Sequence, residues 1–472
     1  MKNNIFKDMF NVGFSSAISM LLSLIATPAI TRIVNPDDYG KFAIFNSYVS
    51  IFSSFLIFGL NDGLLRFFFG YKEETEKKSL FKFCLIIPLI ASILFSAFAI
   101  ILKFLNILNL NFENYIFILL CINVVLTIIN SISIILIQNL QDTKTYSLAI
   151  TVQKFIYCLL PFFLLKWLKH NHLCLLVLAN IISLLFSTLI CFKFSKEYWN
   201  FKSLRFPSNY KDVIKYSIPL YFHFIIYSTY ETIDKLFIEH YCSDIDVGLY
   251  SAATSLVGVF SIVQTAFTVV WRPAQTKHYE DNPEEKQFIK NGNQYMTIIM
   301  FFIGVNVILF KDILCLFVGT AYRECSKIIP FLIFGPITYT PISTVTSGIE
   351  KAKKSIYKLV IIIVSIIVIC AGCIILIPRI GAVGAAISLT ISLLIQYLLT
   401  IYFSNKYYYI NYNVKKYLLI FSLVFIYAFY CSFFDDTVIN IVLYLINISV
   451  LFIIYKHDII TMKDNLKSLL KK

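Results

Sequence analysis

The residues with the clearest chemical potential are charged side chains inside long apolar runs. Asp62 and Arg66 stand four residues apart in one such run, a spacing that puts both on one face of a helix. An ionisable group at membrane depth is costly unless it faces a partner or a watery cavity, so each is a candidate for function. The alternative is a terminal ion pair whose charged ends reach the lipid headgroups.

A second group of charges occupies a later apolar run and suggests ion exchange. Glu231 and Asp234 lie within one helical turn, and two carboxylates held close favour protonation of one of them. We therefore expect one of the two to exchange a proton or a sodium ion, with His223 nearer the middle of the run as a further ion-coupling candidate. In the alternative interpretation Lys235 neutralises Glu231, Asp234 is solvated and His223 is a packed side chain.

Arg272 stands between Trp271 and Pro273 at the end of another apolar run, where it is either a binding residue or an interfacial anchor. The sequence contains no GxxxxGK[ST] phosphate loop, no HExxH, no paired Cys and His zinc spacing and no GxSxG elbow. We therefore expect a protein that is not an enzyme, with no catalytic residues, no metal site and no cofactor other than a coupling ion, proton or sodium.

The composition requires a membrane to position these residues. Of 472 residues, 58% are hydrophobic and 14% are charged, whereas about 25% are charged in ordinary soluble domains. Runs near the ~20 residues that cross a bilayer recur along the chain. They predict an all-α polytopic membrane protein with about fourteen transmembrane helices, over residues 10–33, 42–65, 83–102, 115–137, 146–165, 173–192, 216–238, 247–270, 295–317, 328–349, 359–377, 383–401, 417–434 and 438–454.

The basic residues predict the orientation. With both termini on one side, 31 of the 41 Lys and Arg residues fall on that side and the other 10 on the opposite side. Because cytoplasmic segments collect Lys and Arg, both termini are expected in the cytoplasm and the protein in the cytoplasmic membrane. The net charge of +14 therefore meets anionic lipid rather than nucleic acid.

Internal similarity predicts three parts. A basic segment at 193–215 divides the chain, and an acidic, glycine-containing turn precedes a long helix on either side of it, near Gly40 and Gly248. Arg66 follows Gly40 by 26 residues and Arg272 follows Gly248 by 24. The prediction is a six-helix bundle at 1–200, a second at 201–405, and two extra helices with a tail at 406–472; chance similarity of two outer loops is the alternative.

Eleven cysteines are present, and most lie inside apolar runs, where a free cysteine behaves as a small hydrophobic residue. Cys242 and Cys325 fall in predicted outer loops. These two could pair with each other, although free thiols are expected.

Four segments resemble the multidrug/oligosaccharidyl-lipid/polysaccharide exporter superfamily and, more closely, the Wzx-type polysaccharide flippases. They are TRIVNPDDYGKF at 31–42, IDKLFI at 233–238 with VGLYSAA at 247–253, LFVGTAYRECS at 316–326, and IPRIGAVGAAIS at 377–388. Each segment is degenerate alone. In this order, spread over fourteen predicted helices, they are specific to the superfamily, although they do not fix the substrate.

The resemblance implies two six-helix bundles around a central cavity, two extra C-terminal helices and ion-coupled alternating access. It also implies that cationic residues in the cavity hold a pyrophosphate, and Arg66 and Arg272 match such positions. From its position one helical turn away, we expect Asp62 to hold Arg66 in place while the site is empty. Lys235 stands where relatives commonly have Arg. It keeps the charge but loses the bidentate geometry, so a phosphate contact there is in doubt.

The expected function is therefore that of a flippase. It would move an undecaprenyl-pyrophosphate-linked oligosaccharide from the inner to the outer leaflet for a surface polysaccharide such as O-antigen or capsule. Expected partners are that lipid-linked substrate, membrane lipids, a polysaccharide polymerase and glycosyltransferases. The alternatives are a multidrug or cation antiporter of the same superfamily and a polytopic polysaccharide polymerase or ligase, against which the short outer loops argue.

Overall fold

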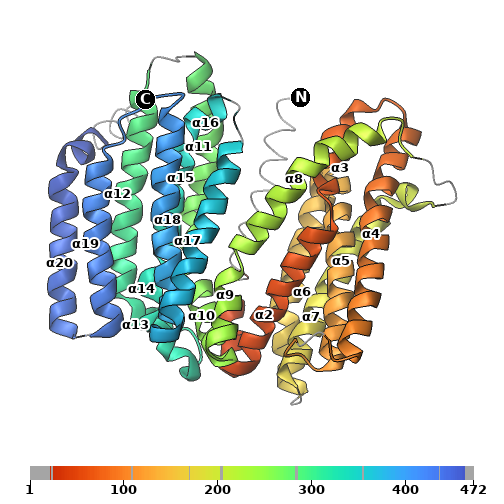
Figure 1. Cartoon of the computed structure of the whole chain (residues 1–472), viewed down its shortest axis with the longest axis horizontal. Helices are drawn as coiled ribbons and strands as arrows, with labels where there is room; N and C mark the ends of the chain where they lie inside the picture. The colour runs from red at the N-terminus through yellow and green to blue at the C-terminus, as the bar shows by residue number, and fades with distance from the viewer. Residues whose placement is uncertain are drawn as a thin grey trace. The chain divides into compact units, whose positions relative to one another are not determined.

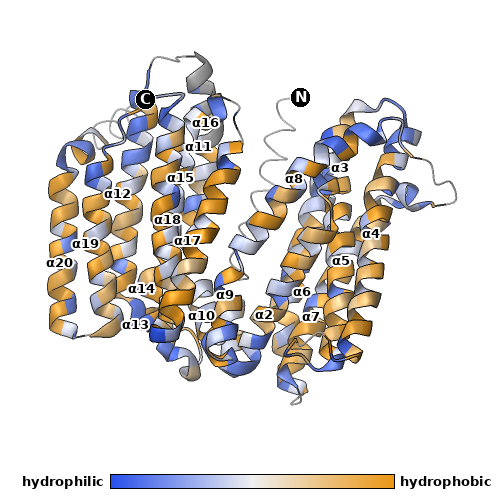
Figure 2. Cartoon of the chain, in the orientation of Figure 1, coloured by the Kyte–Doolittle hydropathy of each residue, from blue (hydrophilic) through white to orange (hydrophobic). Residues whose placement is uncertain are grey.

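The computed structural model describes residues 22, 25–107, 110–168, 171–201, 206–281, 285–352, 354, 356–434 and 436–462. Throughout these ranges the chain forms helices joined by turns, and none of the described residues is in a strand (Figure 1). Figure 2 shows hydrophobic residues along the helices and hydrophilic residues concentrated at their ends, as expected where helix sides face lipid. The prediction of an all-α membrane protein is confirmed.

The chain divides into two compact units, residues 1–232 and residues 233–472. The predicted boundary after residue 200 differs from this division, because α8 packs against α2 and α3 within unit 1. A shared ancestry of the two halves, with boundaries at 200 and 405, stays a prediction. The helices of unit 1 are α2 (Pro36–Leu56), α3 (Leu60–Phe67), η1 (Phe68–Gly70), α4 (Glu74–Phe104), α5 (Asn114–Asn139), α6 (Thr143–Trp167), α7 (His172–Phe194), η2 (Lys196–Trp199) and α8 (Tyr210–Tyr230).

Unit 2 begins with the short helix α9, which packs against α10, α17 and α18. The two predicted extra helices are present as α19 and α20, and they pack against α12 within this unit. The helices of unit 2 are α9 (Ile233–Tyr241), α10 (Asp244–Gly258), α11 (Ser261–Asp281), α12 (Gln287–Leu309), α13 (Lys311–Cys315), η3 (Thr320–Lys327), α14 (Ile329–Leu332), α15 (Phe334–Val345), α16 (Ser347–Lys351), α17 (Ile356–Ile380), α18 (Ala382–Asn405), α19 (Val414–Phe433) and α20 (Thr437–Ile454).

The two acidic turns singled out in the sequence both begin a helix, and they do so in the same way. At α2 the backbone N–H of Asp38 donates to the side chain of Asn35 at 2.8 Å. At α10 the N–H of Asp246 donates to Ser243 Oγ at 3.3 Å, and Asp246 accepts in return from the Ser243 N–H at 3.2 Å. A side-chain acceptor at the cap satisfies an N–H that the first helical turn leaves free. In each case a glycine follows five residues after the cap.

Nine described helices are long and apolar enough to cross a membrane, and the number rises to twelve if each of three bent pairs is one span. The bent pairs are 36–56 with 60–70, 244–258 with 261–268, and 320–327 with 329–345, bent by 55°, 45° and 55°. The predicted count of fourteen is not reached within the described residues. The first predicted span lies mostly outside them, and the seventh corresponds to α8 and α9, which are not among the nine to twelve.

Candidate functional site

The contact between α3 and α8 in unit 1 brings two helix backbones close together through glycine. A Cβ at Gly59 would lie 2.6 Å from the backbone oxygen of Ser217, and one at Gly63 would lie 2.6 Å from Ser217 Oγ. Gly59 also has φ +66°, a left-handed conformation that costs a side-chain-bearing residue about 1–2 kcal/mol. The two glycines form the small-residue spacing that allows close helix packing in membranes. Asn139 on α5 holds the other side of α3 by donating to the Leu64 carbonyl at 3.1 Å.

Close packing of α3 and α8 places polar groups of the two helices in one region. Asp62 on α3 is half-buried and interacts electrostatically with His223 on α8. Buried beside it are Asn61 Oδ1 and Ser217 Oγ, for which the described residues provide no hydrogen-bond partner. From the sequence, Asp62 is expected beside Arg66, and His223 is expected to act with Glu231 and Asp234. In the structure, His223 lies instead on the helix that packs against α3, which carries Asp62.

Arg66 occupies the same short helix as Asp62 but is exposed. The ion pairs of the described residues include Asp62 neither with Arg66 nor with His223; the charge of His223 acts on Asp62 without a direct bond. Arg272 lies in α11, and its side chain lies outside the described residues. Arg66 lies in α3, the second helix of the bent pair 36–56 with 60–70, and Arg272 lies in α11, beyond the residues 261–268 that complete the bent pair beginning at 244. That the two arginines occupy related positions stays a prediction.

Asp234 at the start of α9 is the buried carboxylate of the predicted coupling group. It is 7% exposed. The Tyr250 hydroxyl of α10 donates to its Oδ2 at 2.5 Å, and the Lys235 backbone N–H donates to its Oδ1 at 2.8 Å. The thiol of Cys373 on α17 is close enough to Asp234 for the two groups to interact electrostatically. The charge of Lys235 in the same helix acts on this carboxylate and partly compensates for its burial. A buried carboxylate on a helix that packs against α10, α17 and α18 is suited to binding a small cation or a proton, since burying a charge is unfavourable.

A break in the predicted seventh helix separates the other members of that group. The helix α8 ends at Tyr230 and α9 begins at Ile233. Glu231 follows α8 and is exposed, whereas Lys235 in α9 is half-buried. The expected single helical turn holding Glu231, Asp234 and Lys235 is therefore interrupted. Residues 231 and 232 form a turn, in which the Thr232 N–H donates to the Thr229 carbonyl, three residues back, at 3.2 Å before α9 begins.

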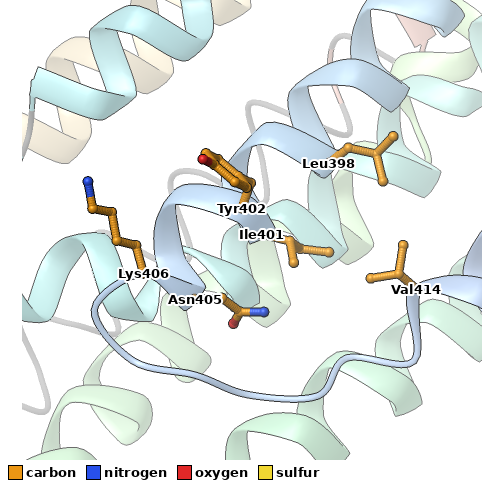
Figure 3. A pocket seen from close by; sticks show the side chains of 6 residues that line it. All are labelled: Leu398, Ile401, Tyr402, Asn405, Lys406 and Val414. Atoms are coloured by element: carbon orange, nitrogen blue, oxygen red, sulfur yellow. The ribbon is translucent and has the colours of Figure 1, made fainter.

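A pocket of about 600 Å³ lies at the ends of α18 and α19 in unit 2. Leu398, Ile401, Tyr402, Asn405 and Lys406 reach it from α18, and Val414 reaches it from the start of α19 (Figure 3). Its wall is mainly apolar, with a single cation. The six lining residues include none of the predicted site residues, so the pocket is separate from the charged groups described above.

The charged groups described above are chemically suited to binding cations and anions. Among them, His, Cys, Asp and Glu side chains form no group of three or more that could hold a metal ion. Sequence reasoning missed Tyr250, Ser217 and the two glycines. The Gly59 and Gly63 spacing could have been found as a small-residue motif, but the bond from Tyr250 depends on the packing of α10 against α9 and leaves no local signal.

Long apolar helices, three bent helix pairs and charged residues within the apolar runs define a polytopic membrane protein. Solved structures share this fold. A lipid II flippase MurJ in an inward closed conformation has a TM-score of 0.68 at 14% identity, covering 96% of this chain and 99% of that one. An inward-facing multidrug resistance transporter of the MATE family and MOP superfamily has a TM-score of 0.63 at 12% identity, covering 84% and 97%.

The polysaccharide biosynthesis protein family matches residues 5–279, and the chain belongs to this family. A curated relative, the capsular polysaccharide biosynthesis protein CapF of Staphylococcus aureus, is 26% identical in an alignment of 262 positions that covers 53% of this chain. The match covers 65% of the length of that relative. The family match and the shared fold agree with the resemblance found in the sequence: the chain is a polysaccharide biosynthesis protein with the fold of these solved membrane transporters.

Proposed function

We propose that this protein flips an undecaprenyl-pyrophosphate-linked oligosaccharide from the inner to the outer leaflet of the cytoplasmic membrane, for assembly of a surface polysaccharide. The observation that carries the proposal is a flippase-type fold along nearly the whole chain in a member of the polysaccharide biosynthesis family. Glycosyltransferases would supply the lipid-linked substrate on the cytoplasmic side, and a polymerase would consume it outside.

Arg66 is the proposed pyrophosphate ligand in unit 1. Its side chain is exposed on α3, and α3 is fixed by α8 through the glycine contacts and by α5 through Asn139. A guanidinium donates in a planar fork that suits several phosphate oxygens at once. Arg272, in α11, is the proposed second ligand.

The test replaces each arginine and measures surface polysaccharide at matched expression. Each charge-assisted bond contributes roughly 1.5–3 kcal/mol, so Arg66→Ala or Arg272→Ala should weaken substrate binding about tenfold or more and reduce polysaccharide. Arg66→Lys should restore part of the activity at most, because the fork geometry is lost. Arg379→Ala, an exposed arginine at the end of α17, is the matched control and should leave polysaccharide unchanged.

Full polysaccharide in both alanine variants would remove the arginines from the substrate site. Equal activity of the lysine and arginine forms would instead support interfacial anchoring, for which only the charge matters.

Coupling to an ion gradient is the second part of the proposal, with Asp234 as the coupling carboxylate. Of the two carboxylates near the α8–α9 break, Asp234 is buried and bonded to the neutral Tyr250 hydroxyl, whereas Glu231 is exposed. Because Asp234 is buried, binding of a cation to it would change its interactions with the neighbouring helices, whereas binding to the exposed Glu231 would not.

Multidrug export is the second candidate function, favoured by the fold likeness to the MATE transporter. The two candidates make opposite predictions in a deletion strain. A flippase restores surface polysaccharide without changing drug resistance, and a drug antiporter raises resistance without restoring polysaccharide.

A further inference from the structure

Two cysteines meet in unit 2 outside the groups described so far. Cys315 is the last residue of α13, and Cys325 lies in η3 ten residues later. Their Sγ atoms are 3.2 Å apart, and the residues are 2% and 0% exposed. Cys242, which the sequence allowed as a partner for Cys325, lies instead in the turn between α9 and α10.

The helix ends of unit 2 differ in charge, and the cysteine pair lies at the less basic end. In Figure 1, α13 lies at the opposite end of the unit from α16. The end of the unit at α16 carries Lys351. The helix ends on the same side, at the start of α12, the end of α18 and the start of α19, carry further lysines: Lys286, Lys290, Lys406, Lys415 and Lys416. Because the more basic end is the cytoplasmic one, the pair belongs on the outer side, where disulfides form and persist.

We propose that Cys315 and Cys325 form a disulfide on the outer face of the membrane, which rests on the orientation given in the proposed function. The thiols must approach by about 1 Å to reach a sulfur–sulfur bond of ~2.05 Å, a small movement for side chains on two short packed helices. The bond would close a loop that joins α12 to α14 and packs over α10 and α19.

The reaction is a thiol–disulfide exchange. A thiolate of the pair attacks the disulfide of an extracytoplasmic thiol oxidase, giving a mixed disulfide, and the second thiolate then displaces the reduced enzyme. The cysteine pair loses two protons and two electrons, and the oxidase disulfide is reduced to a dithiol. Because both thiols are buried in the folded chain, exchange occurs on the translocated segment before it packs.

Trypsin separates the two cysteines, which makes the bond directly measurable. Cleavage at Lys311, Arg323 and Lys327 gives peptides 312–323 and 324–327, each with one cysteine. Cells are quenched in acid, the full-length protein is alkylated under denaturing conditions, and the digest is analysed without reductant. The expected product is the two peptides joined, and reduction should release them.

Matched controls come from the same chain. Cys315→Ser or Cys325→Ser should abolish the joined peptides and leave the remaining cysteine alkylated. Cys370 and Cys373 in α17 should be alkylated without reductant, because they lie within a membrane helix. Reductant should lower the melting midpoint of the purified wild-type protein by a few degrees and leave the double Cys→Ala variant unmoved.

Recovery of both peptides fully alkylated, or of Cys325 joined to Cys242, would overturn the proposal, as would a joined peptide seen only in cells left unquenched. An equal effect of reductant on wild type and double variant would overturn the stabilising role. A cysteine at Asp244, at the start of α10, reports the orientation separately. If it labels from outside while the pair is reduced, the disulfide proposal fails and the orientation stands.

Discussion

At the residue scale, the neighbourhood of Asp234 decides between two carboxylates that look equivalent in the sequence. Asp234 and Glu231 are three residues apart, yet one is buried with a bond from Tyr250 and the other is exposed beyond α8. Burial makes the charge of Asp234 sensitive to its surroundings, and exposure leaves that of Glu231 to water.

Asp234→Asn should therefore abolish the dependence of transport on an imposed proton or sodium gradient, measured in vesicles of defined composition. Tyr250→Phe removes one charge-assisted bond of roughly 1.5–3 kcal/mol and should shift the ion concentration for half-maximal coupling about tenfold. Glu231→Gln is the matched control and should keep the dependence. Coupling that survives in Asp234→Asn but not in Glu231→Gln would reverse the assignment.

Sequence reasoning predicts such residues only in part. It identifies Asp62, His223 and Asp234 because an ionisable residue inside an apolar run can be recognised without knowledge of the fold. It cannot pair them, because Asp62 meets His223 only after α3 packs on α8, some 160 residues away in the chain. Tyr250 is one of many tyrosines in the sequence until α10 packs against α9.

At the element scale, glycine determines how closely α3 and α8 approach. A methyl group at Gly59 would meet a backbone oxygen, which cannot move aside as the end of a side chain can. This contact fixes the position of α3, which carries Asp62 and Arg66. Its loss would lower the stability of the protein and displace both site residues.

Gly59→Ala should lower the stability of the protein by roughly 1–3 kcal/mol, from the left-handed backbone conformation and the backbone contact together. Thermal melting in detergent checks this. Gly70→Ala is the control, because a Cβ there meets nothing within 4 Å, and it should change stability by less than about 0.5 kcal/mol. Equal melting of the two variants would contradict the close approach of α3 and α8.

Run length predicted where the helices lie but not where they bend. Apolarity continues through the bends after Leu56 and Gly258, so an average over twenty residues passes across them unchanged. The break between α8 and α9 falls inside the predicted span 216–238 for the same reason. Bends depend on local hydrogen bonding and packing, which hydropathy does not record.

At the scale of the whole molecule, the charge asymmetry predicts which helix ends face the cytoplasm. Single cysteines at Lys77 or Lys354, in a background without other cysteines, should be protected from impermeant thiol reagents in intact cells. One at Asp244 should label readily, because the capped start of α10 belongs to the less basic side. The opposite labelling pattern would overturn the orientation and, with it, the direction of transport proposed here.

The place of α8 within unit 1 also determines where the gene could be cut into two coexpressed fragments. A cut between codons 200 and 206, at the basic linker, would deliver α8 with the second polypeptide. The first fragment would then insert with Gly59 and Gly63 exposed to lipid and with the buried Asn61 Oδ1 beside them uncovered, while Ser217 Oγ would be uncovered on α8 in the second fragment. A cut after codon 231 leaves α8 with the helices it covers, so complementing halves of this protein should be sought there.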